Sequence, residues 1–423
     1  MTRGQLKVID DTRQRKSWLD GFMAYPMPVG SAEAQVRRNI SHLDQRLYSL
    51  WNLGENLIYA WTLLPRGLLL LLAPHTLLIE FVGEATDEAE SRRRSALLQQ
   101  LLARRTHLPP DDFAQIASEL MVTPQSVDLP FAPLDDLGLP LLAALVERYG
   151  LRLVEDRAVI LLDAVGFSLL APLQQVVQLN SLSCSVNSAY AKLLDREINI
   201  NFARTTTGDG FYIWNRMRGL TANVELYQLM QFILADNALA RERASLPGAV
   251  PQLRSCFHVG SHYEFHQSEG LNPTSFSYLV GPVTIELARM IERTLPGQIL
   301  VGKFETQMFD EADGHTVTLD SLDFVQRARE PTRQLNGVSL AGAEIDSIIC
   351  YLTGPPRRAA EGQLGDAYHI REYELTDKHG QPHRVFNAKI NIHRRAGRPI
   401  LLGLRDADLQ GFAARSLPCG EIC

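Results

Sequence analysis

The stretch RAVILLDAVGFS, residues 157–168, decides how the middle of the chain is expected to fold. Its first part, residues 157–163, is a nearly continuous apolar run that ends in an acid, Asp163. Such a run is typical of a central strand that is buried on both faces. A tight turn with Gly166 follows, and Pro172 then opens a helix at a position that proline favours. The sequence therefore predicts a buried strand with a carboxylate at its end, followed by a glycine turn and a helix.

The segments that follow continue the alternation of strands and helices. Strand-like runs at 198–201 and 211–214 flank TTTGDG, which predicts a hairpin. Further strands are expected at 257–260 and 298–304, with a helix at 282–293 between them. The order is strand, helix, hairpin, strand, helix, strand. This order predicts an α+β fold in which helices pack on one face of a mostly antiparallel sheet.

The length of 423 residues predicts two or three domains, because domains usually run to about 100–200 residues. We expect residues 1–150 to form a mixed α/β module and residues 151–320 to form the domain described above. Residues 321–423 alternate strand-like runs with glycine- and proline-containing turns, which predicts a small β-rich domain. The two flanking domains are candidate regulatory or sensory modules.

The charge balance limits the classes of function. A net charge of −6 and a pI near 6.0 argue against a general nucleic-acid binder. They leave a nucleotide substrate open, because bound metal ions supply local positive charge. The five scattered cysteines do not resemble a disulfide framework, so reduced thiols in a cytoplasm are expected. For Cys419 and Cys423, a metal or redox pair stays open beside a frayed tail.

One apolar segment, residues 56–79, raises the question of a membrane, because about 20 apolar residues can span a bilayer. Turn signals at residues 65–67 interrupt it, and Arg66 would be costly in the middle of a membrane. The start of the chain is charged and has no apolar signal region. We expect two buried elements joined by a turn, with membrane association as the alternative.

Two acids form the candidate site. Asp163 ends the central strand, and Asp209 lies in the hairpin turn. If the hairpin pairs beside the central strand, both carboxylates point to one edge of the sheet. Two carboxylates and the phosphates of a nucleotide make an oxygen-rich site that suits Mg²⁺ or Mn²⁺. The turn at Gly166 lets the backbone approach a phosphate near a helix N-terminus. The alternatives are a strand-end cap for the first acid and ordinary turn chemistry for the second.

The histidines offer a second metal hypothesis. His258, His262 and His266 recur every four residues, so in a helix they would share one face and could bind zinc. The apolar residues around His258 and the nearby Gly260 favour a strand and loop instead. Arg204, beside the hairpin, is expected to be a surface charge, with a phosphate contact as the alternative.

Five segments together resemble the catalytic domain of class III nucleotidyl cyclases. They occur in the family's order over about residues 155–305: DAVGFS at 163–168 resembles D-[IV]-x-G-F-[ST], TTTGDGFYIW at 205–214 the second metal hairpin, CFHVGSH at 256–262 the G-I-H-x-G strand, GPVTIELARM at 281–290 the G-D-x-V-N-x-A-x-R-M helix, and GQILVG at 297–302 the strand that closes the domain. The resemblance implies a ferredoxin-like arrangement of the sheet and its helices.

The resemblance also implies a mechanism. Two ions, Mg²⁺ or Mn²⁺, would be held by Asp163, Asp209 and the backbone carbonyl of Ala164. The ribose 3′-oxygen of a nucleoside triphosphate would attack the α-phosphorus, and pyrophosphate would leave. Arg289 matches the arginine that stabilises charge in the transition state. Family members build the site between two such domains, and this chain has one, so a homodimer with Arg289 acting across the interface is implied.

The expected substrate contacts depart from the family in part. The turn after the metal-binding strand is expected to contact phosphate through Val165, Gly166 and Phe167. The family asparagine that orients the ribose is Ile285 here, which cannot hydrogen-bond. The positions that read the base are Thr205 and Tyr278, a pair that fits neither the adenylate nor the guanylate cyclase pattern.

The base-reading positions determine the function that we expect. A bulky Tyr278 would shrink a purine pocket and favours a pyrimidine; bacterial antiphage cyclases of this fold make cyclic CMP or cyclic UMP. The alternatives are an adenylate cyclase, a degenerate cyclase domain that binds nucleotide or only dimerises as a sensor, and a membrane-tethered signalling protein.

Overall fold

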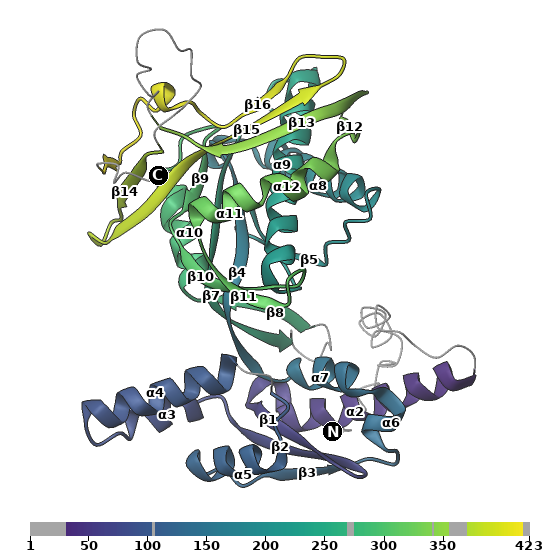
Figure 1. Ribbon diagram of the computed structural model, residues 1–423. Helices are drawn as coiled ribbons and strands as arrows, with labels where there is room; N and C mark the ends of the chain where they lie inside the picture. The colour runs from purple at the N-terminus through teal and green to yellow at the C-terminus, as the bar shows by residue number, and fades with distance from the viewer. Residues whose placement is uncertain (1–30, 104–105, 269–274, 341, 355–369, 418–423) are drawn as a thin grey trace, which may run out of the picture. The chain divides into compact units, whose positions relative to one another are not determined.

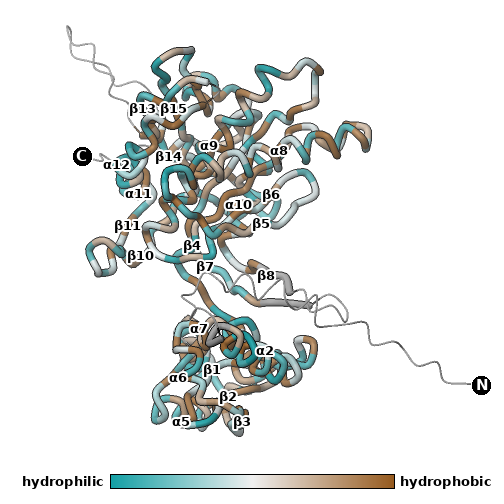
Figure 2. The backbone as a smooth tube through the Cα atoms, turned by 90° about the vertical axis from the view of Figure 1, so that its right-hand side faces the viewer, coloured by the Kyte–Doolittle hydropathy of each residue, from teal (hydrophilic) through white to brown (hydrophobic). Residues whose placement is uncertain are grey.

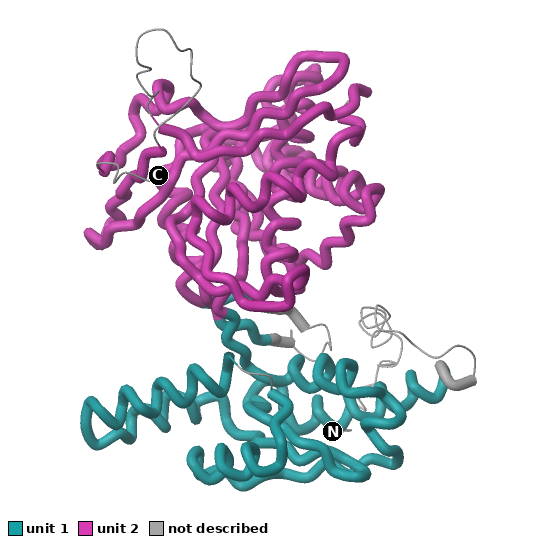
Figure 3. Tube along the Cα trace, viewed as in Figure 1, with its two compact units in different colours: residues 1–154, 263–280 teal, residues 155–262, 281–423 magenta. Residues whose placement is uncertain are grey.

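The computed structural model describes residues 31–103, 106–268, 275–340, 342–354 and 370–417 (Figure 1). The chain divides into two compact units (Figure 3). The first comprises residues 1–154 and 263–280, and the second comprises residues 155–262 and 281–423. Two long strands, β4 (Leu151–Ala164) and β7 (Leu253–Ser268), contain the residues at which one unit gives way to the other.

The first unit combines helices with a three-stranded antiparallel sheet in the order β1–β2–β3. Its elements are α2 (Ser31–Trp51), η2 (Asn52–Gly54), β1 (Asn56–Leu64), β2 (Gly67–Pro74), α3 (Leu77–Gly83), α4 (Glu88–Ala103), α5 (Pro110–Glu119), β3 (Gln125–Asp128), α6 (Pro133–Leu137) and α7 (Leu139–Glu147), with β8 (Ser275–Val280) paired to the end of β7. The hydrophobic residues of β1 and β2 can be followed in Figure 2.

The apolar segment 56–79 is a β-hairpin at its start, with β1 and β2 joined at residues 65–66. The expectation of two elements joined by a turn is therefore confirmed for this segment. Burial explains its apolar character, because Ile58, Trp61 and Leu70 have no exposed surface. No helix in the part of the chain that the structure describes is long and apolar enough to cross a membrane.

The second unit is built on a large sheet whose longest path runs β12–β13–β15–β9–β7–β4–β6–β5. After β4, its elements are η3 (Phe167–Leu169), α8 (Pro172–Leu194), β5 (Phe202–Thr206), β6 (Gly210–Asn215), α9 (Gly219–Arg243), β7, α10 (Pro282–Arg293), β9 (Ile299–Gly302), β10 (Glu305–Asp310), β11 (His315–Asp320), α11 (Ser321–Arg327), α12 (Arg329–Thr332), η4 (Arg333–Leu335), β12 (Ser339–Leu340), β13 (Ala343–Leu352), β14 (Glu372–Thr376), β15 (Pro382–Arg394), β16 (Ile400–Leu402), η5 (Asp406–Asp408) and β17 (Arg415–Ser416).

The pairing in this sheet is mostly antiparallel, as the sequence predicted. Strands β4, β6 and β5 are antiparallel neighbours, as are β9, β15 and β13. The pair β7–β9 is parallel. The predicted α+β class is thus confirmed, while the ferredoxin-like arrangement stays a prediction.

Side chains alternate between the two faces of the central strand β4, which is buried throughout residues 157–164. Ala158, Ile160 and Leu162 belong to the large hydrophobic core, to which α8, α9 and α11 also contribute. Because successive strand residues point to opposite faces, Asp163 lies on the other face. This face is the one that α10 covers, since the hydroxyl of Tyr212 in β6 donates to the carbonyl of Thr284 in α10 at 3.3 Å.

One expectation about the fold was wrong, and one helix was not predicted. Helices lie on both faces of the sheet and not on one, because α10 packs opposite α8 and α9. The sequence analysis also missed α9, the helix at the centre of the core. Seventeen of its residues are buried. A helix that is buried nearly all round has no apolar stripe, so its periodicity gives no signal.

The boundary expected near residue 320 does not separate compact units. Strand β15 pairs with β9 from Val385↔Gly302 to Ala388↔Ile299, and β13 pairs with β15 in turn. Residues 321–423 therefore extend the same sheet and belong to the same unit as residues 155–262. Composition changes along the chain, but hydrogen bonds between distant strands decide where a unit ends.

Replacing Gly210 by alanine should destabilise the second unit. Gly210 pairs with Asp163, and a Cβ at this position would lie 1.8 Å from the carbonyl oxygen of Leu162. The strands would have to separate, at a cost of about 1–3 kcal/mol. Thermal unfolding followed by circular dichroism measures the loss. Gly260→Ala is the matched control, because its added Cβ meets nothing closer than 3.4 Å. Equal melting temperatures for the two variants would contradict the prediction.

Candidate functional site

The two acids singled out in the sequence lie at one edge of the sheet, namely where strand β4 ends and strand β6 begins. Asp163 is in register with Gly210 across the β4–β6 pair, and Asp209 lies in the turn that precedes β6. The N–H of Ala164 donates to the carbonyl of Asp209 at 3.0 Å. Within the turn, Thr207 donates its hydroxyl to the Asp209 carboxylate at 3.0 Å. The hairpin therefore does pair beside the central strand, which was the condition for bringing the carboxylates together.

The pKa of the Asp163 carboxyl depends on its burial and on the charged side chains beside it. Burial raises the pKa of its carboxyl above the ordinary range for an aspartate. Arg254 acts in the opposite direction, because its Nε donates to Asp163 Oδ2 at 2.6 Å. The carboxylate of Asp209 again raises the pKa, since a second negative charge nearby disfavours ionisation. A divalent cation between the two acids would remove this repulsion.

Arg254 is a residue of the site that the sequence analysis missed. It lies in β7, is partly exposed, and also donates to the carbonyl of Thr294 at 3.4 Å. Phe257 and Val259 of β7 belong to the large core, so the alternation places Arg254 and Cys256 on the opposite face, with Asp163. The signal in the sequence was the alternation in LRSCFHV, which puts a cation on the face of that strand that carries the acids.

The donor set at this edge fits a hard divalent cation. No cluster of three or more His, Cys, Asp or Glu side chains that could hold a metal occurs among the described residues. A cation at the edge would thus take two carboxylates, from Asp163 and Asp209, and the carbonyl oxygen of Ala164. Mg²⁺ is commonly held by one or two carboxylates together with substrate phosphates. The residues present therefore match a site that is completed by a substrate.

The turn that follows the strand is shaped by a glycine. Gly166 has a φ of 70°, in the left-handed region, and an added Cβ would meet nothing within 4 Å. The N–H of Val165 donates to the carbonyl of Gln252 at 2.8 Å, so in this conformation it does not face a ligand. Phe167 opens the short η3 turn, which comes before α8 and separates the strand from the helix N-terminus at Pro172.

The residues expected to read the ribose and the base are spread over both compact units. Thr205 is exposed in β5, opposite Tyr212. Ile285 is 55% exposed on α10. Tyr278 lies in β8, where it pairs with Phe265, and belongs to the first unit. The structure therefore brings the two acids together but does not place the two base-reading positions in one unit.

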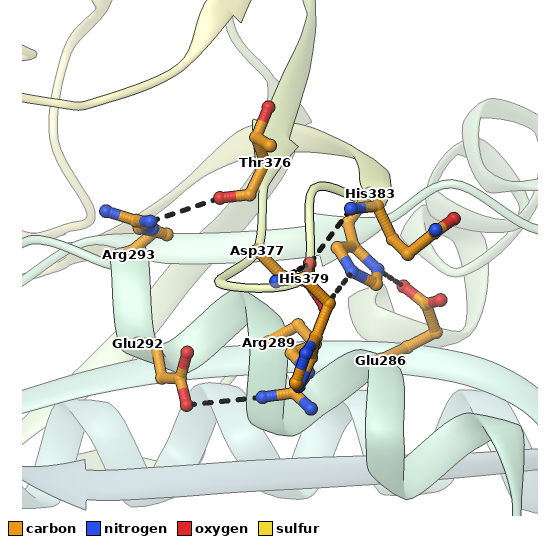
Figure 4. A network of polar contacts seen from close by, with 9 residues as sticks. Glu286, Arg289, Glu292, Arg293, Thr376, Asp377, His379 and His383 are labelled. Atoms are coloured by element: carbon orange, nitrogen blue, oxygen red, sulfur yellow. Dashed lines mark hydrogen bonds and ion pairs between the residues drawn. The ribbon is translucent and has the colours of Figure 1, made fainter.

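The candidate catalytic arginine is held by two carboxylates (Figure 4). Arg289, on α10, lies with Nε 3.3 Å from Asp377 Oδ2 and with one terminal nitrogen 3.5 Å from Glu292. Asp377 comes from the turn between β14 and β15. The arginine is thus anchored, and none of its contacts with described residues is to Asp163 or Asp209.

The anchor itself is strongly ionised. Burial raises the pKa of Asp377, but the N–H groups of Gln381 and His379 and the side chain of His383 outweigh it and lower the pKa to about 2. His383 also contacts Glu286 on α10, with Nδ1 2.7 Å from Oε2. Arg293 of α10 also donates to the carbonyl of Thr376 at 3.1 Å, so the hairpin β14–β15 is tied to α10 at three points.

The segment DKHGQP, residues 377–382, has the composition of a turn, and its sequence alone predicts nothing more. Its partners lie far away along the chain, so no local pattern could have revealed the contact with Arg289. The same limit applies to His383 and Glu286. The contacts of Asp377 and His383 with α10 were missed because only the pairing of distant strands brings these two residues to that helix.

The histidine hypothesis fails on secondary structure. His258 and His262 lie in strand β7, and so does His266, whose side chain lies outside the description. The helical spacing required for a shared zinc site is therefore absent. Burial lowers the pKa of His258 to about 4, so its ring is neutral near pH 7.

Arg204 is exposed and lies over the ring of Phe211, 5.0 Å from its centre. Cys419 and Cys423 lie outside the described residues.

Comparison with known proteins gives structural neighbours only. No family model matches the chain, and no curated protein matches it. The guanylate cyclase domain of RhGC from Catenaria anguillulae, solved in complex with GTP, is 10% identical, covers 58% of this chain and 100% of its own, and has a TM-score of 0.33. The adenylyl cyclase CyaB from P. aeruginosa is 11% identical, covers 59% and 97%, and has a TM-score of 0.28.

A bacterial light-regulated adenylyl cyclase is also similar, with 12% identity, coverage of 44% of this chain and 100% of its own, and a TM-score of 0.28. The neighbours are thus guanylyl and adenylyl cyclase structures at low similarity. The function proposed below rests on the residues of this chain and not on these values.

Replacing Asp209 by asparagine should stabilise the second unit at neutral pH. The substitution removes the charge that raises the pKa of Asp163 and leaves the contact with Arg254 in place. We expect a rise in melting temperature of roughly 2 °C at pH 7 in EDTA. The rise should shrink as the pH falls through the raised pKa of Asp163, because a protonated Asp163 no longer repels a second carboxylate.

Asp408→Asn is the control for this experiment. Asp408 forms an exposed contact with Arg405 at 2.7 Å, and losing it should not raise the melting temperature. A drop for Asp209→Asn, or a gain that is the same at every pH, would show that the two carboxylates do not interact.

Proposed function

We propose that the protein is a metal-dependent nucleotidyl cyclase. It converts a nucleoside triphosphate to a 3′,5′-cyclic nucleotide and pyrophosphate. The observation that carries the proposal is the placement of Asp163 and Asp209 at one sheet edge by the β4–β6 pairing, with Arg254 beside them. The two carboxylates provide ligands for a cation, and the guanidinium provides a contact for phosphate oxygens.

The metal-binding half of the proposed site consists of Asp163, Asp209 and the carbonyl of Ala164. Bound Mg²⁺ or Mn²⁺ would neutralise triphosphate charge and favour the ionised ribose 3′-hydroxyl. In the reaction the bond from the 3′-oxygen to the α-phosphorus forms while the bond to the bridging oxygen breaks. Pyrophosphate leaves with the electron pair of that bond, and the 3′-hydroxyl proton passes to solvent.

Two arginines have different tasks in the proposed site. Arg254 contacts the triphosphate, because it lies against Asp163 and is partly exposed. Arg289 stabilises the charge that develops in the transition state. Its described contacts are to Asp377 and Glu292, which supports the proposal that it serves the site of a second copy. Asp377 is then a positioning residue, because it holds the Arg289 guanidinium through Nε and leaves the other terminal nitrogen for substrate.

The five segments that resemble cyclases support the proposal through their places in the structure. DAVGFS begins at the end of β4, TTTGDGFYIW covers the β5–β6 hairpin, and CFHVGSH lies within β7. GPVTIELARM forms most of α10, and GQILVG contains β9. Strands β4, β6, β7 and β9 are neighbours in one sheet, and α10 covers the face with Asp163. The segments therefore lie together in one sheet and on a helix that covers it, which supports the proposal.

For the base we propose a pyrimidine, so that the product is cyclic CMP or cyclic UMP. Thr205 and Tyr278 depart from both purine patterns, and Ile285 removes the usual ribose contact. An adenylate cyclase is the second candidate for the substrate. A degenerate domain that binds nucleotide without turning it over is favoured by Ile285 and by the occupied N–H of Val165.

Activity of the purified protein tests the proposal directly. Incubation with ATP, GTP, CTP or UTP and Mn²⁺, with products identified by mass, should yield a cyclic nucleotide from at least one, and CTP or UTP is expected. Asp163→Asn should lower kcat by about a thousandfold or more, because a metal ligand is lost. Asp408→Asn, an exposed acid in a turn, should leave it unchanged. No cyclic product from any of the four with dimeric protein would refute the proposal.

Mixing two inactive variants tests the shared site. Asp163→Ala and Arg289→Ala should each be inactive alone, because each homodimer lacks one essential group in both sites. A heterodimer of the two places both lesions in one site and leaves the other intact. The mixture should therefore recover up to roughly a quarter of wild-type activity if subunits assort at random. Mixing Asp163→Ala with Asp209→Ala is the control. Each of the two sites in that heterodimer then lacks one metal ligand, so no activity should return.

A further inference from the structure

A cavity of about 740 Å³ lies in the second unit and shares no residue with the proposed cyclase site. One wall is formed by α11, α12 and η4, and the other by β13. The helix side contributes Leu322, Val325 and Arg329, and the strand side contributes Ser347 and Ile349. Pockets for small molecules usually measure about 300–1,000 Å³, so this volume is in the range of a ligand site.

The described part of the cavity lining carries positive charge in an acidic protein. Among the described residues that line it are Arg329 and Arg333 and no aspartate or glutamate, although the whole chain has a net charge of −6. Arg333 pairs with Glu330 at 2.8 Å, but both side chains are more than 70% exposed. Such an exposed pair contributes little and exchanges readily. The lining therefore favours an anion over a cation.

Arg329 is prepared to hold an anion. Its Nε donates to the carbonyl of Cys350 in β13 at 3.0 Å, in a partly buried position. Within the described residues no carboxylate forms an ion pair with it. A guanidinium fixed through Nε still presents two terminal nitrogens, which match the two oxygens of a carboxylate or phosphate. Arg329 itself is exposed, so its terminal nitrogens are accessible to an anion that enters from solvent.

The strand side explains why the cavity stays open. Strand β12 pairs with β13 only at Ala343 and Glu344, so further along β13 forms the edge of the sheet in the described part of the chain. Ile349 lies on this stretch and is 45% exposed. Exposed apolar groups at an uncovered strand edge favour contact with a partner or a ligand. The apolar walls thus suit the body of a molecule whose charged group lies at Arg329.

We propose that this cavity binds a small organic anion, with a carboxylate or phosphate group on Arg329 and an apolar or aromatic body against Leu322, Val325 and Ile348. The amides of Asn336 and Asn391 also line the cavity and provide further polar contacts. The proposal does not depend on the cyclase reaction, because every residue that carries it lies outside the metal-binding edge.

Titration calorimetry with three probes tests the proposal on the full chain. The probes are 1-naphthoate, 1-naphthyl phosphate and the uncharged 1-naphthamide, which share one aromatic body. At least one anion should bind with a stoichiometry of one per chain, and the amide should bind at least tenfold more weakly. The two anions distinguish a carboxylate ligand from a phosphate ligand. Binding should weaken with added salt.

Two variants locate the probe. Arg329→Gln keeps a polar side chain without charge and should weaken anion binding at least tenfold. Leu322→Trp should fill the cavity from the helix side and reduce binding of every probe. Arg415→Gln removes a guanidinium that is 77% exposed and pairs with Glu374, and it should change nothing. Circular dichroism checks that each variant is folded.

Two results would contradict the proposal that the cavity binds an anion. Equal affinity for the three probes would show that the cavity does not select a charge. Unchanged anion affinity in both Arg329→Gln and Leu322→Trp would place the probe elsewhere, the nucleotide site included. Either result overturns the proposal and leaves the cyclase assay unaffected, so the two proposals fail separately.

Discussion

The close pairing of β4 with β6 is the constraint on which the proposed site depends. The two backbones approach so closely at Asp163 and Gly210 that no Cβ fits between Gly210 and the carbonyl of Leu162. This approach places the turn acid Asp209 beside the strand acid. The pairing therefore holds two like charges together, and Arg254 compensates one of them only in part. A protein under selection for stability alone would not keep this arrangement, which is typical of sites that bind a charged ligand.

Local sequence patterns predicted the strand and the hairpin that carry Asp163 and Asp209. They did not predict the residues that surround these two acids. The apolar run at 157–163 and the turn TTTGDG specify a buried strand and a hairpin by their own chemistry, so both could be predicted. Helix α9 could not be predicted, because burial on all sides removes the periodicity that marks a helix. The side of the sheet covered by α10 depends on contacts such as Tyr212 with Thr284, which no single segment contains.

Long-range pairing also explains why the compact unit continues past residue 320. The turn chemistry and the short strands after that point do resemble a separate small domain. Hydrogen bonds from β15 to β9 nevertheless join them to the sheet that carries the acids. One result is that Asp377, far from α10 in sequence, becomes the partner of Arg289. A separate third domain would have left this arginine without its anchor.

Strand β15 has a consequence for regulation. Near its start His383 holds Glu286 of α10, and eight positions later Asn391 lines the cavity beside β13. At about 3.3 Å per residue these positions are roughly 26 Å apart on one continuous strand. If occupation of the cavity shifts β15, the ligand and the Arg289 anchor become thermodynamically linked. The linkage is reciprocal, so a nucleotide that draws Arg289 away from Asp377 would change the affinity of the distant cavity by the same factor.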